Sequence, residues 1–337
     1  MGLTFLRLFL SRLVAFQHRD FRLFWLGLLI ATTGAQMQVI AVNWHVYDLL
    51  KETSASFSLF GRSISLSAGA LGLGGLGLAR VLPIIVFALL GGMLADTVNR
   101  RHLLVFTLTA SAAIAALLAF LSLSGRVSVP TIYLLAAGAS AMLALQQPAR
   151  ESLVPNLVPR QHLMNAVSLN TLLMMIGTIV GPIIAGLVVE WTQIGLVYVL
   201  VALAFIPAVI ALSMMHYSGQ VETKNGGLGW QALVEGFQFT YGTRMIWNTM
   251  LLDFFATLLA SARTLLPIVA NEILGVGAAG YGILATAQPI GAVLAGTIIS
   301  LRREIYRQGA IFLICVAVYG AATALFGVST LFALSYL

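Results

Sequence analysis

Long apolar runs alternate with short polar breaks along the whole chain. A helix that crosses a bilayer needs about 20 mostly apolar residues, because the hydrocarbon core is about 30 Å thick and a helix rises about 1.5 Å per residue. Nine stretches have this character, and they lie at 23–47, 71–95, 103–124, 130–147, 163–189, 195–215, 246–270, 278–300 and 309–335. The pattern therefore predicts an all-α polytopic membrane protein with about nine transmembrane helices.

The composition agrees with a membrane protein and argues against a soluble one. Hydrophobic residues make up 60% of the 337 positions and charged residues only 9%, with a mean hydropathy of +0.98, whereas soluble domains carry roughly 25% charged residues. The net charge of +7 is better explained by basic loops on one side of a membrane than by nucleic-acid binding. The single cysteine, Cys315, cannot form an internal disulfide and is expected to be a buried, inert thiol.

The basic residues indicate how the chain is oriented. With the N-terminus in the cytoplasm, the outside loops hold only Lys51, Arg62 and Arg126, and two further arginines lie within spans. The inside segments hold the remaining thirteen, which are Arg7, Arg12, Arg19, Arg22, Arg100, Arg101, Arg150, Arg160, Lys224, Arg244, Arg302, Arg303 and Arg307. This bias is what the positive-inside rule expects, so we predict a cytoplasmic N-terminal segment at 1–22.

The longest polar break divides the chain into two parts. It reads YSGQVETKNGGLG at 217–229, which is typical of a flexible linker, and the following WQALVEGFQFTYG suits a helix on the cytoplasmic surface. We therefore expect a six-helix bundle at 23–216, a linker with a surface helix at 217–245, and a partial second bundle at 246–337. Two helical bundles joined in this way are typical of secondary transporters.

Two motifs make this layout specific. Gly92, Leu94, Ala95, Asp96, Arg100 and Arg101 match the signature G-x-L-A-D-x-x-G-R-R/K of the major facilitator superfamily, in the loop between the second and third spans. The chain departs from the signature at Thr97, where a basic residue is common, and at Asn99, where glycine is usual. Since asparagine tolerates a left-handed backbone, we expect the turn to survive at Asn99.

The second motif, GTIVGPIIAG at 177–186, resembles the antiporter signature on the fifth span of this superfamily. The region 146–170 is similar to the branch that contains the bacterial enterobactin exporter and macrolide-efflux permeases. The resemblance covers nearly the whole chain and implies the major facilitator fold. Family members usually have about twelve spans, so we expect spans ten to twelve to be absent here.

The resemblance implies roles for both motifs. Gly92, Asp96, Arg100 and Arg101 would control the conformation of the two bundles, and the alternative is a simple basic turn. On the fifth span, the residues expected to bend the helix and seal a cavity are Gly177, Gly181, Pro182 and Gly186; the alternative is ordinary close packing of small residues.

Charged residues within spans are candidates for function, because ionisable groups at membrane depth are costly. Asp253 is the candidate proton site, and Arg80 is expected either to bind an anionic substrate or to neutralise Asp253. Arg263 lies about 15 Å along the helix from Asp253, too far for a direct pair. A structural ion pair between the bundles is the alternative for these charges.

Several polar residues carry weaker expectations. Gln36 and Asn43, seven positions apart, share one face of a helix and are expected to line a cavity or to bond between helices. Asp48 and Glu190, at the outer ends of their spans, are expected to be solvated, and the alternative is that they carry protons. The segment 130–147 lacks the buried arginine that the superfamily often uses for proton coupling, which weakens the case for antiport. We have no function for the insertion at 56–70.

Other classes of function have little support. The glycines at 72–77 fit G-x-G-x-x-G, but the dinucleotide fold requires a preceding strand and a soluble helix. The sequence contains neither a P-loop nor metal-ligand spacing nor a nucleophile triad, so we expect no cofactor, no metal and no enzyme.

The sequence thus predicts a monomeric secondary transporter in a bacterial cytoplasmic (inner) membrane. It would export a small amphipathic molecule, siderophore-like or drug-like, by alternating access coupled to protons. The alternative is a truncated, non-transporting remnant or a membrane interaction protein.

Overall fold

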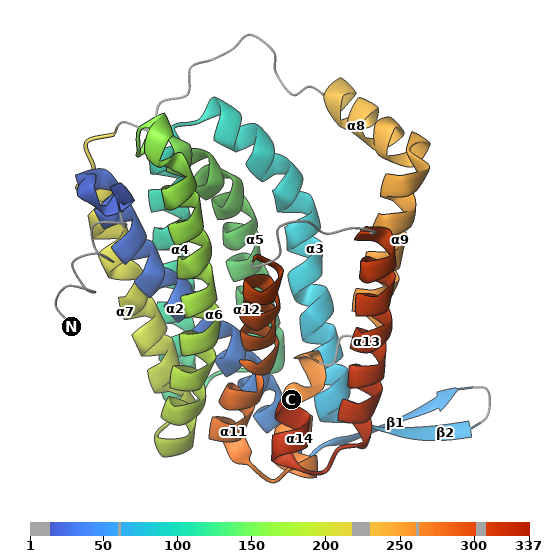
Figure 1. Cartoon of the computed structure of the whole chain (residues 1–337). Helices are drawn as coiled ribbons and strands as arrows, with labels where there is room; N and C mark the ends of the chain where they lie inside the picture. The colour runs from blue at the N-terminus through green and yellow to red at the C-terminus, as the bar shows by residue number, and fades with distance from the viewer. Residues whose placement is uncertain (1–13, 60–61, 218–229, 261–262, 301–307) are drawn as a thin grey trace, which may run out of the picture.

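Six long helices form one bundle in the first part of the chain (Figure 1). The computed structural model describes residues 14–59, 62–217, 230–260, 263–300 and 308–337. After a short 3-10 turn, η1 (Val14–Gln17), the bundle consists of α2 (Arg19–Leu50), α3 (Ala68–Thr97), α4 (Arg100–Leu123), α5 (Val129–Leu153), α6 (Leu163–Trp191) and α7 (Ile194–Ser213). Two 3-10 turns, η2 (Val154–Asn156) and η3 (Arg160–His162), connect α5 to α6.

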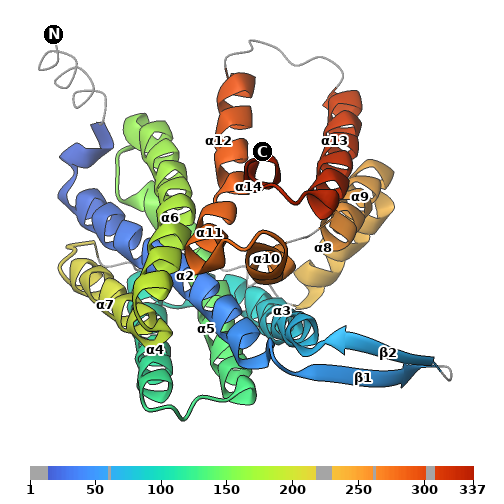
Figure 2. The same ribbon diagram turned by 90° about the horizontal axis from the view of Figure 1, so that it is seen from below.

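The second part of the chain contains shorter helices. They are α8 (Trp230–Gly242), α9 (Arg244–Ala260), the 3-10 turn η4 (Arg263–Leu265), α10 (Leu266–Ile268), the π-helical turn η5 (Val269–Ile273), α11 (Gly277–Leu284), α12 (Ala287–Ser300), α13 (Gln308–Val328) and α14 (Phe332–Tyr336). Figure 2 shows α10, α11 and α12 beside the six-helix bundle, and α8, α9 and α13 grouped apart from α12. The α11 helix packs against α6, and α10 packs against α2.

The expected helical membrane fold is confirmed. Among the described residues, eight helical segments are long and apolar enough to cross a membrane. The ninth expected span, at 246–270, does not form one such helix, because α9 is described to Ala260 and the chain from Arg263 follows short 3-10, α and π turns. Residues 1–13 and 218–229, where the N-terminal segment and the linker were expected, lie outside the described part.

A β-hairpin interrupts the helical pattern, and we did not predict it. Strands β1 (Ser54–Leu59) and β2 (Arg62–Ser67) pair antiparallel, with Ser54 opposite Ser67 and Leu59 opposite Arg62. The sequences SASFSL and RSISLS alternate small polar and apolar residues, and a period of two favours a strand over a helix. The hairpin projects from the bundle between α2 and α3 (Figures 1 and 2), and it accounts structurally for most of the insertion noted at 56–70.

Helix α2 lies at the centre of the bundle because small residues let its neighbours approach. It packs against both α6 and α7. At Gly181 on α6, an added Cβ would lie 2.7 Å from the backbone oxygen of Thr33, so only glycine permits this crossing. The indole Nε1 of Trp25 donates to the Leu169 carbonyl oxygen at 2.8 Å, which satisfies a buried donor and fixes the register of α2 against α6.

The turn between α3 and α4 differs from our expectation. Asn99 has φ −56° and ψ 114°, so its backbone is not left-handed. It is instead the N-cap of α4, and its side-chain oxygen accepts hydrogen bonds from the backbone N–H groups of Arg101 and His102. Asparagine is among the best N-cap residues because its side-chain oxygen satisfies the free N–H groups of the first turn. The substitution at the usual glycine position therefore starts the next helix.

Candidate functional site

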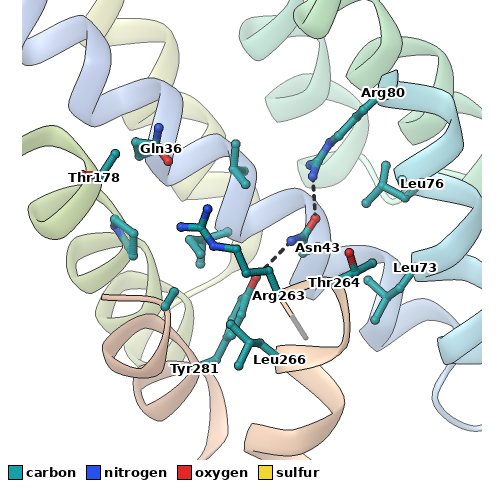
Figure 3. A pocket seen from close by; sticks show the side chains of 15 residues that line it. Gln36, Asn43, Leu73, Leu76, Arg80, Thr178, Arg263, Thr264, Leu266 and Tyr281 are labelled. Carbon is teal, nitrogen blue, oxygen red and sulfur yellow. Dashed lines mark hydrogen bonds between the residues drawn. The ribbon is translucent and has the colours of Figure 1, made fainter. Parts of the chain in front are cut away.

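A cavity lies between the six-helix bundle and the second part of the chain. Its volume is about 180 Å³, and its lining includes Gln36 and Asn43 of α2, Arg80 of α3 and Arg263 of η4 (Figure 3). Gln36 and Asn43 lie on one face of α2 because seven residues make nearly two helical turns. The cavity therefore brings together four of the five residues proposed from the sequence as substrate or proton groups; Asp253 does not line it.

A chain of hydrogen bonds crosses one wall of this cavity. Arg80 Nη1 donates to Asn43 Oδ1 at 2.8 Å, and Asn43 Nδ2 donates to the hydroxyl oxygen of Tyr281 at 3.1 Å (Figure 3). Asn43 is only 8% exposed, and Trp44 stacks on the Tyr281 ring with centroids 5.9 Å apart. The chain links α3, α2 and α11, so it joins the two parts of the molecule. We did not identify Tyr281 from the sequence, where it is one of nine tyrosines and has no distinctive neighbour.

Arg263 lies at the boundary of two cavities. Its side chain extends over the first cavity beside Tyr281 (Figure 3), and it also lines a second one of about 480 Å³ together with Asp253, Gln288 and Cys315. Asp253 and Cys315 are exposed in this structure; for Cys315, the expectation of a buried thiol was therefore wrong. Among the described residues, no ion pair within 4 Å joins Asp253 to Arg263 or to Arg80.

Two further cavities extend the first one toward the other end of the bundle. One, of about 190 Å³, shares Arg80 and Val39 with it. The other, of about 480 Å³, shares Gln36 and Val39 and reaches Gly92 at the end of α3. The lining of this larger cavity is mainly apolar, with a volume in the range of small-molecule sites. Together, the cavities offer polar and cationic groups at one end and an apolar chamber next to them.

The burial of Arg150 was not predicted by our sequence analysis. We assigned it to a cytoplasmic segment and found no buried arginine in the fourth span, which we took to end at 147. Helix α5 continues to Leu153. Arg150 is therefore only 5% exposed, and it lines the mainly apolar cavity that reaches Gly92. Its Nη2 donates to Asn170 Oδ1 at 3.0 Å. A buried arginine therefore does belong to the fourth span, which removes our argument against proton coupling.

The glycine motif of α6 contacts helices on two sides. Gly177 and Gly181 lie against α2, while Gly186 lies against α11, where an added Cβ would be 2.6 Å from the Ala278 carbonyl oxygen. Pro182 lies inside α6 and lines the first cavity. The motif thus lets α6 contact α2 within the bundle and α11 of the second part of the chain; its expected role in bending the helix and sealing a cavity stays a prediction.

Polar contacts join the two parts of the chain at the end of the molecule where α2 and α6 finish, here called the contact end. Glu190 Oε2 accepts hydrogen bonds from the backbone N–H groups of Ala278 at 2.9 Å and Ala279 at 3.3 Å, and it thereby caps α11. Tyr47 donates to Glu272 at 3.1 Å. Glu190 is exposed, as expected, but its role as a cap was not foreseen, because the sequence does not reveal that α11 begins beside it.

Asp48 behaves as expected at the same end. Its side chain is 49% exposed, and its carboxylate forms an ion pair with Lys51 at 2.7 Å. This hydrogen bond raises the pKa of the Lys51 ammonium. Such an exposed pair contributes little to stability.

The loop motif at 91–101 is described in part. Arg101 Nη2 donates to the carbonyl oxygen of Ser213 at 2.5 Å, where a cation is favoured by the dipole at the end of α7. Arg100 is the first residue of α4. The side chain of Asp96 lies outside the described residues, so its expected role in gating stays a prediction.

Comparisons with known proteins agree with this arrangement. The sequence matches the family described as transmembrane secretion effector over residues 10–336. It is 24% identical to the staphyloferrin A transporter of Staphylococcus aureus over 66% of this chain and 56% of that protein, and 25% identical to the enterobactin exporter EntS of Shigella boydii over 92% and 70%. The chain therefore spans little more than half the length of the first relative and about two thirds of the second.

Solved structures share the fold. A bacterial homologue of the human lysosomal transporter Spinster, in an inward-facing and occupied conformation, superposes with a TM-score of 0.62 at 14% identity, covering 93% of this chain and 69% of that one. The unoccupied form of that protein gives a TM-score of 0.61. The family match spans nearly the whole sequence, and its members are transporters, not enzymes. This chain belongs to the transmembrane secretion effector family of the major facilitator superfamily.

Proposed function

We propose that the protein is a secondary transporter that exports small amphipathic molecules from a bacterial cytoplasm. The observation that carries this proposal is a pair of cavities that share Gln36 and Val39: one with polar groups between the two parts of the chain, and a mainly apolar one beside it within the six-helix bundle. Relatives that carry siderophores, a transporter for staphyloferrin A and an exporter for enterobactin, support a siderophore-like or drug-like cargo.

Alternating access is the mechanism that this geometry supports. The predicted orientation places the N-terminus in the cytoplasm, so the contact end, where α2 and α6 finish, faces outward. The cavities continue from there toward Gly92 and Arg150, on the cytoplasmic side. Export would require the contacts at Glu190 and Gly186 to open and the cytoplasmic side to close. The loop residues Asp96, Arg100 and Arg101 would then stabilise one of the two conformations.

The proton gradient is the energy source that we propose. Asp253 shares a cavity with Arg263. Arg263 also lines the first cavity, here called the central cavity and taken as the substrate site, so a change in charge at Asp253 would be felt there. An acid beside a cavity can take up and release a proton as the conformation changes its access to water. The protein is proposed to act as a monomer in the inner membrane.

Everted membrane vesicles provide the test. Vesicles that contain the protein should accumulate a labelled catecholate siderophore or a labelled hydrophobic drug, and a protonophore should abolish the accumulation. Vesicles from cells without the protein are the control. Accumulation that equals the control for both cargo classes would contradict transport, and accumulation that a protonophore leaves unchanged would contradict proton coupling.

A further inference from the structure

The charges that face the central cavity are all of one sign. Arg80 and Arg263 line it, and every other described lining residue is neutral. Asp253 lies on the second cavity, and Glu272 lies at the contact end, where it accepts from Tyr47. Among the described residues, neither arginine has an ion-pair partner within 4 Å. Two guanidinium groups therefore approach one cavity without a carboxylate to balance them.

Such an arrangement favours a bound anion. A guanidinium keeps its charge at any physiological pH and presents five N–H donors. Two like charges on the lining of one cavity repel each other, and a bound anion relieves that repulsion. The bond from Arg80 to the neutral amide of Asn43 orients the guanidinium and leaves its remaining N–H groups without a partner among the described residues.

The size and the surroundings of the cavity limit the kind of anion. A volume of about 180 Å³ is slightly larger than a protein cavity of about 150 Å³ that holds one benzene molecule. Tyr281, stacked on Trp44, forms an aromatic wall. The adjoining cavity of about 480 Å³, reached past Gln36 and Val39, is mainly apolar. A ligand that occupies both cavities would place an anionic group, carried on one aromatic ring or chain, in the central cavity. Its apolar body would lie in the adjoining cavity.

We propose that Arg80 and Arg263 form a subsite for the carboxylate, or another oxyanion, of an amphipathic organic anion whose apolar body occupies the adjoining cavity. Asn43 is a positioning residue, because it holds Arg80 at the cavity wall through its own bond to Tyr281. The inference deepens the proposed function by selecting organic anions from the amphipathic cargo named there.

Calorimetric titration of the purified protein in phosphatidylcholine nanodiscs tests the subsite. The probes are 4-cyclohexylbenzoate and its neutral counterpart 4-cyclohexylbenzamide, which share a shape and differ in charge. We expect the carboxylate to bind about tenfold more tightly than the amide or better, since hydrogen bonds to charged groups are the stronger ones. Equal affinities for the two probes would overturn the proposal.

Substitutions at the two arginines test whether they cause the preference for the carboxylate probe. Arg80→Gln and Arg263→Gln should each weaken carboxylate binding by about tenfold and leave amide binding unchanged, which also shows that the variants fold. Arg126→Gln, in the exposed turn after α4, is the matched control and should change neither. Arg80→Lys keeps the charge and should retain a reduced preference. A full preference in both glutamine variants would overturn the assignment.

The binding assay needs no ion gradient, so it separates the two proposals. A preference for the carboxylate without protonophore-sensitive accumulation in vesicles would contradict the transport proposal alone. Proton-driven accumulation of cargo by a protein that binds both probes equally would contradict the anion subsite alone.

Discussion

The crossing of α6 and α11 gives the sharpest test of how the contact end is held together. An alanine at Gly282 would place its Cβ 2.4 Å from the carbonyl oxygen of Pro182 and 3.0 Å from the Cα of Gly186. Both neighbours are backbone atoms, so no side chain can rotate away to make room. Gly282→Ala must therefore push α6 and α11 apart wherever they cross in this conformation.

The magnitude follows from the cost of overpacking. Inserting a methyl group into a tightly packed contact costs about 1–3 kcal/mol. Alanine also favours a helix over glycine by about 0.5–1 kcal/mol, but that gain applies to both conformations as long as α11 stays helical. Since about 1.4 kcal/mol is a factor of ten, the equilibrium should shift about 5- to 150-fold toward the conformation in which the contact end is open.

Chemical labelling measures this shift. In a Cys315→Ser background, Thr178→Cys places one thiol on the lining of the central cavity. We expect Gly282→Ala to raise the rate at which a membrane-impermeant methanethiosulfonate reagent, added from outside, modifies that thiol. Gly296→Ala on α12 is the control, because an added Cβ there meets no atom within 4 Å. An unchanged rate in Gly282→Ala, or the same increase in the control, would refute the reasoning.

Three further changes test other contacts. Glu190→Gln removes the negative charge at the N-terminus of α11, so it should raise the same labelling rate about two- to fivefold; a rate unchanged from that of the unaltered protein would mean that the charge does not hold this end. Trp25→Phe removes the bond to Leu169 and should cost about 1 kcal/mol, seen as a lower unfolding temperature, whereas Trp191→Phe, at a side chain 76% exposed, should leave that temperature unchanged. Asp253→Asn should abolish the accumulation that a protonophore suppresses, and full accumulation would exclude Asp253 as the coupling site.

Hydropathy predicted most of the helices because the bilayer imposes a length on each of them. It did not predict where α5 ends, and it missed the β-hairpin between α2 and α3. The fourth apolar stretch ends at 147, just before Pro148, but α5 continues to Leu153. A proline lacks only its own N–H, so a helix can continue beyond it, and the Ser152 hydroxyl donates to the Pro148 carbonyl oxygen at 2.6 Å within the continued turn. The extra turn buries Arg150. The β-hairpin was missed because its serine-rich strands are too short and too polar to register among apolar spans.

Individual residues of the candidate site could be predicted from the sequence, but the contacts between them could not. Gln36, Asn43 and Arg80 were found because polar side chains at membrane depth are expensive and therefore informative. Their partners were not, since Asn43 and Tyr281 are 238 positions apart and only the packing of α11 against α6 brings them together. Glu190 resembles any solvated acid at the end of a span until the position of α11 is known.

The positions of the two arginines connect the subsite to the conformational change. Arg80 belongs to α3 in the six-helix bundle, whereas Arg263 belongs to η4 in the second part of the chain. A ligand shifts a conformational equilibrium only to the extent that it binds one state better than the other. An anion held by both guanidinium groups satisfies that condition, because any movement that separates the two parts removes one of its cations. Such an anion would stabilise the conformation in which the contact end is closed, and its release would follow from the same separation that opens the crossing at Gly282.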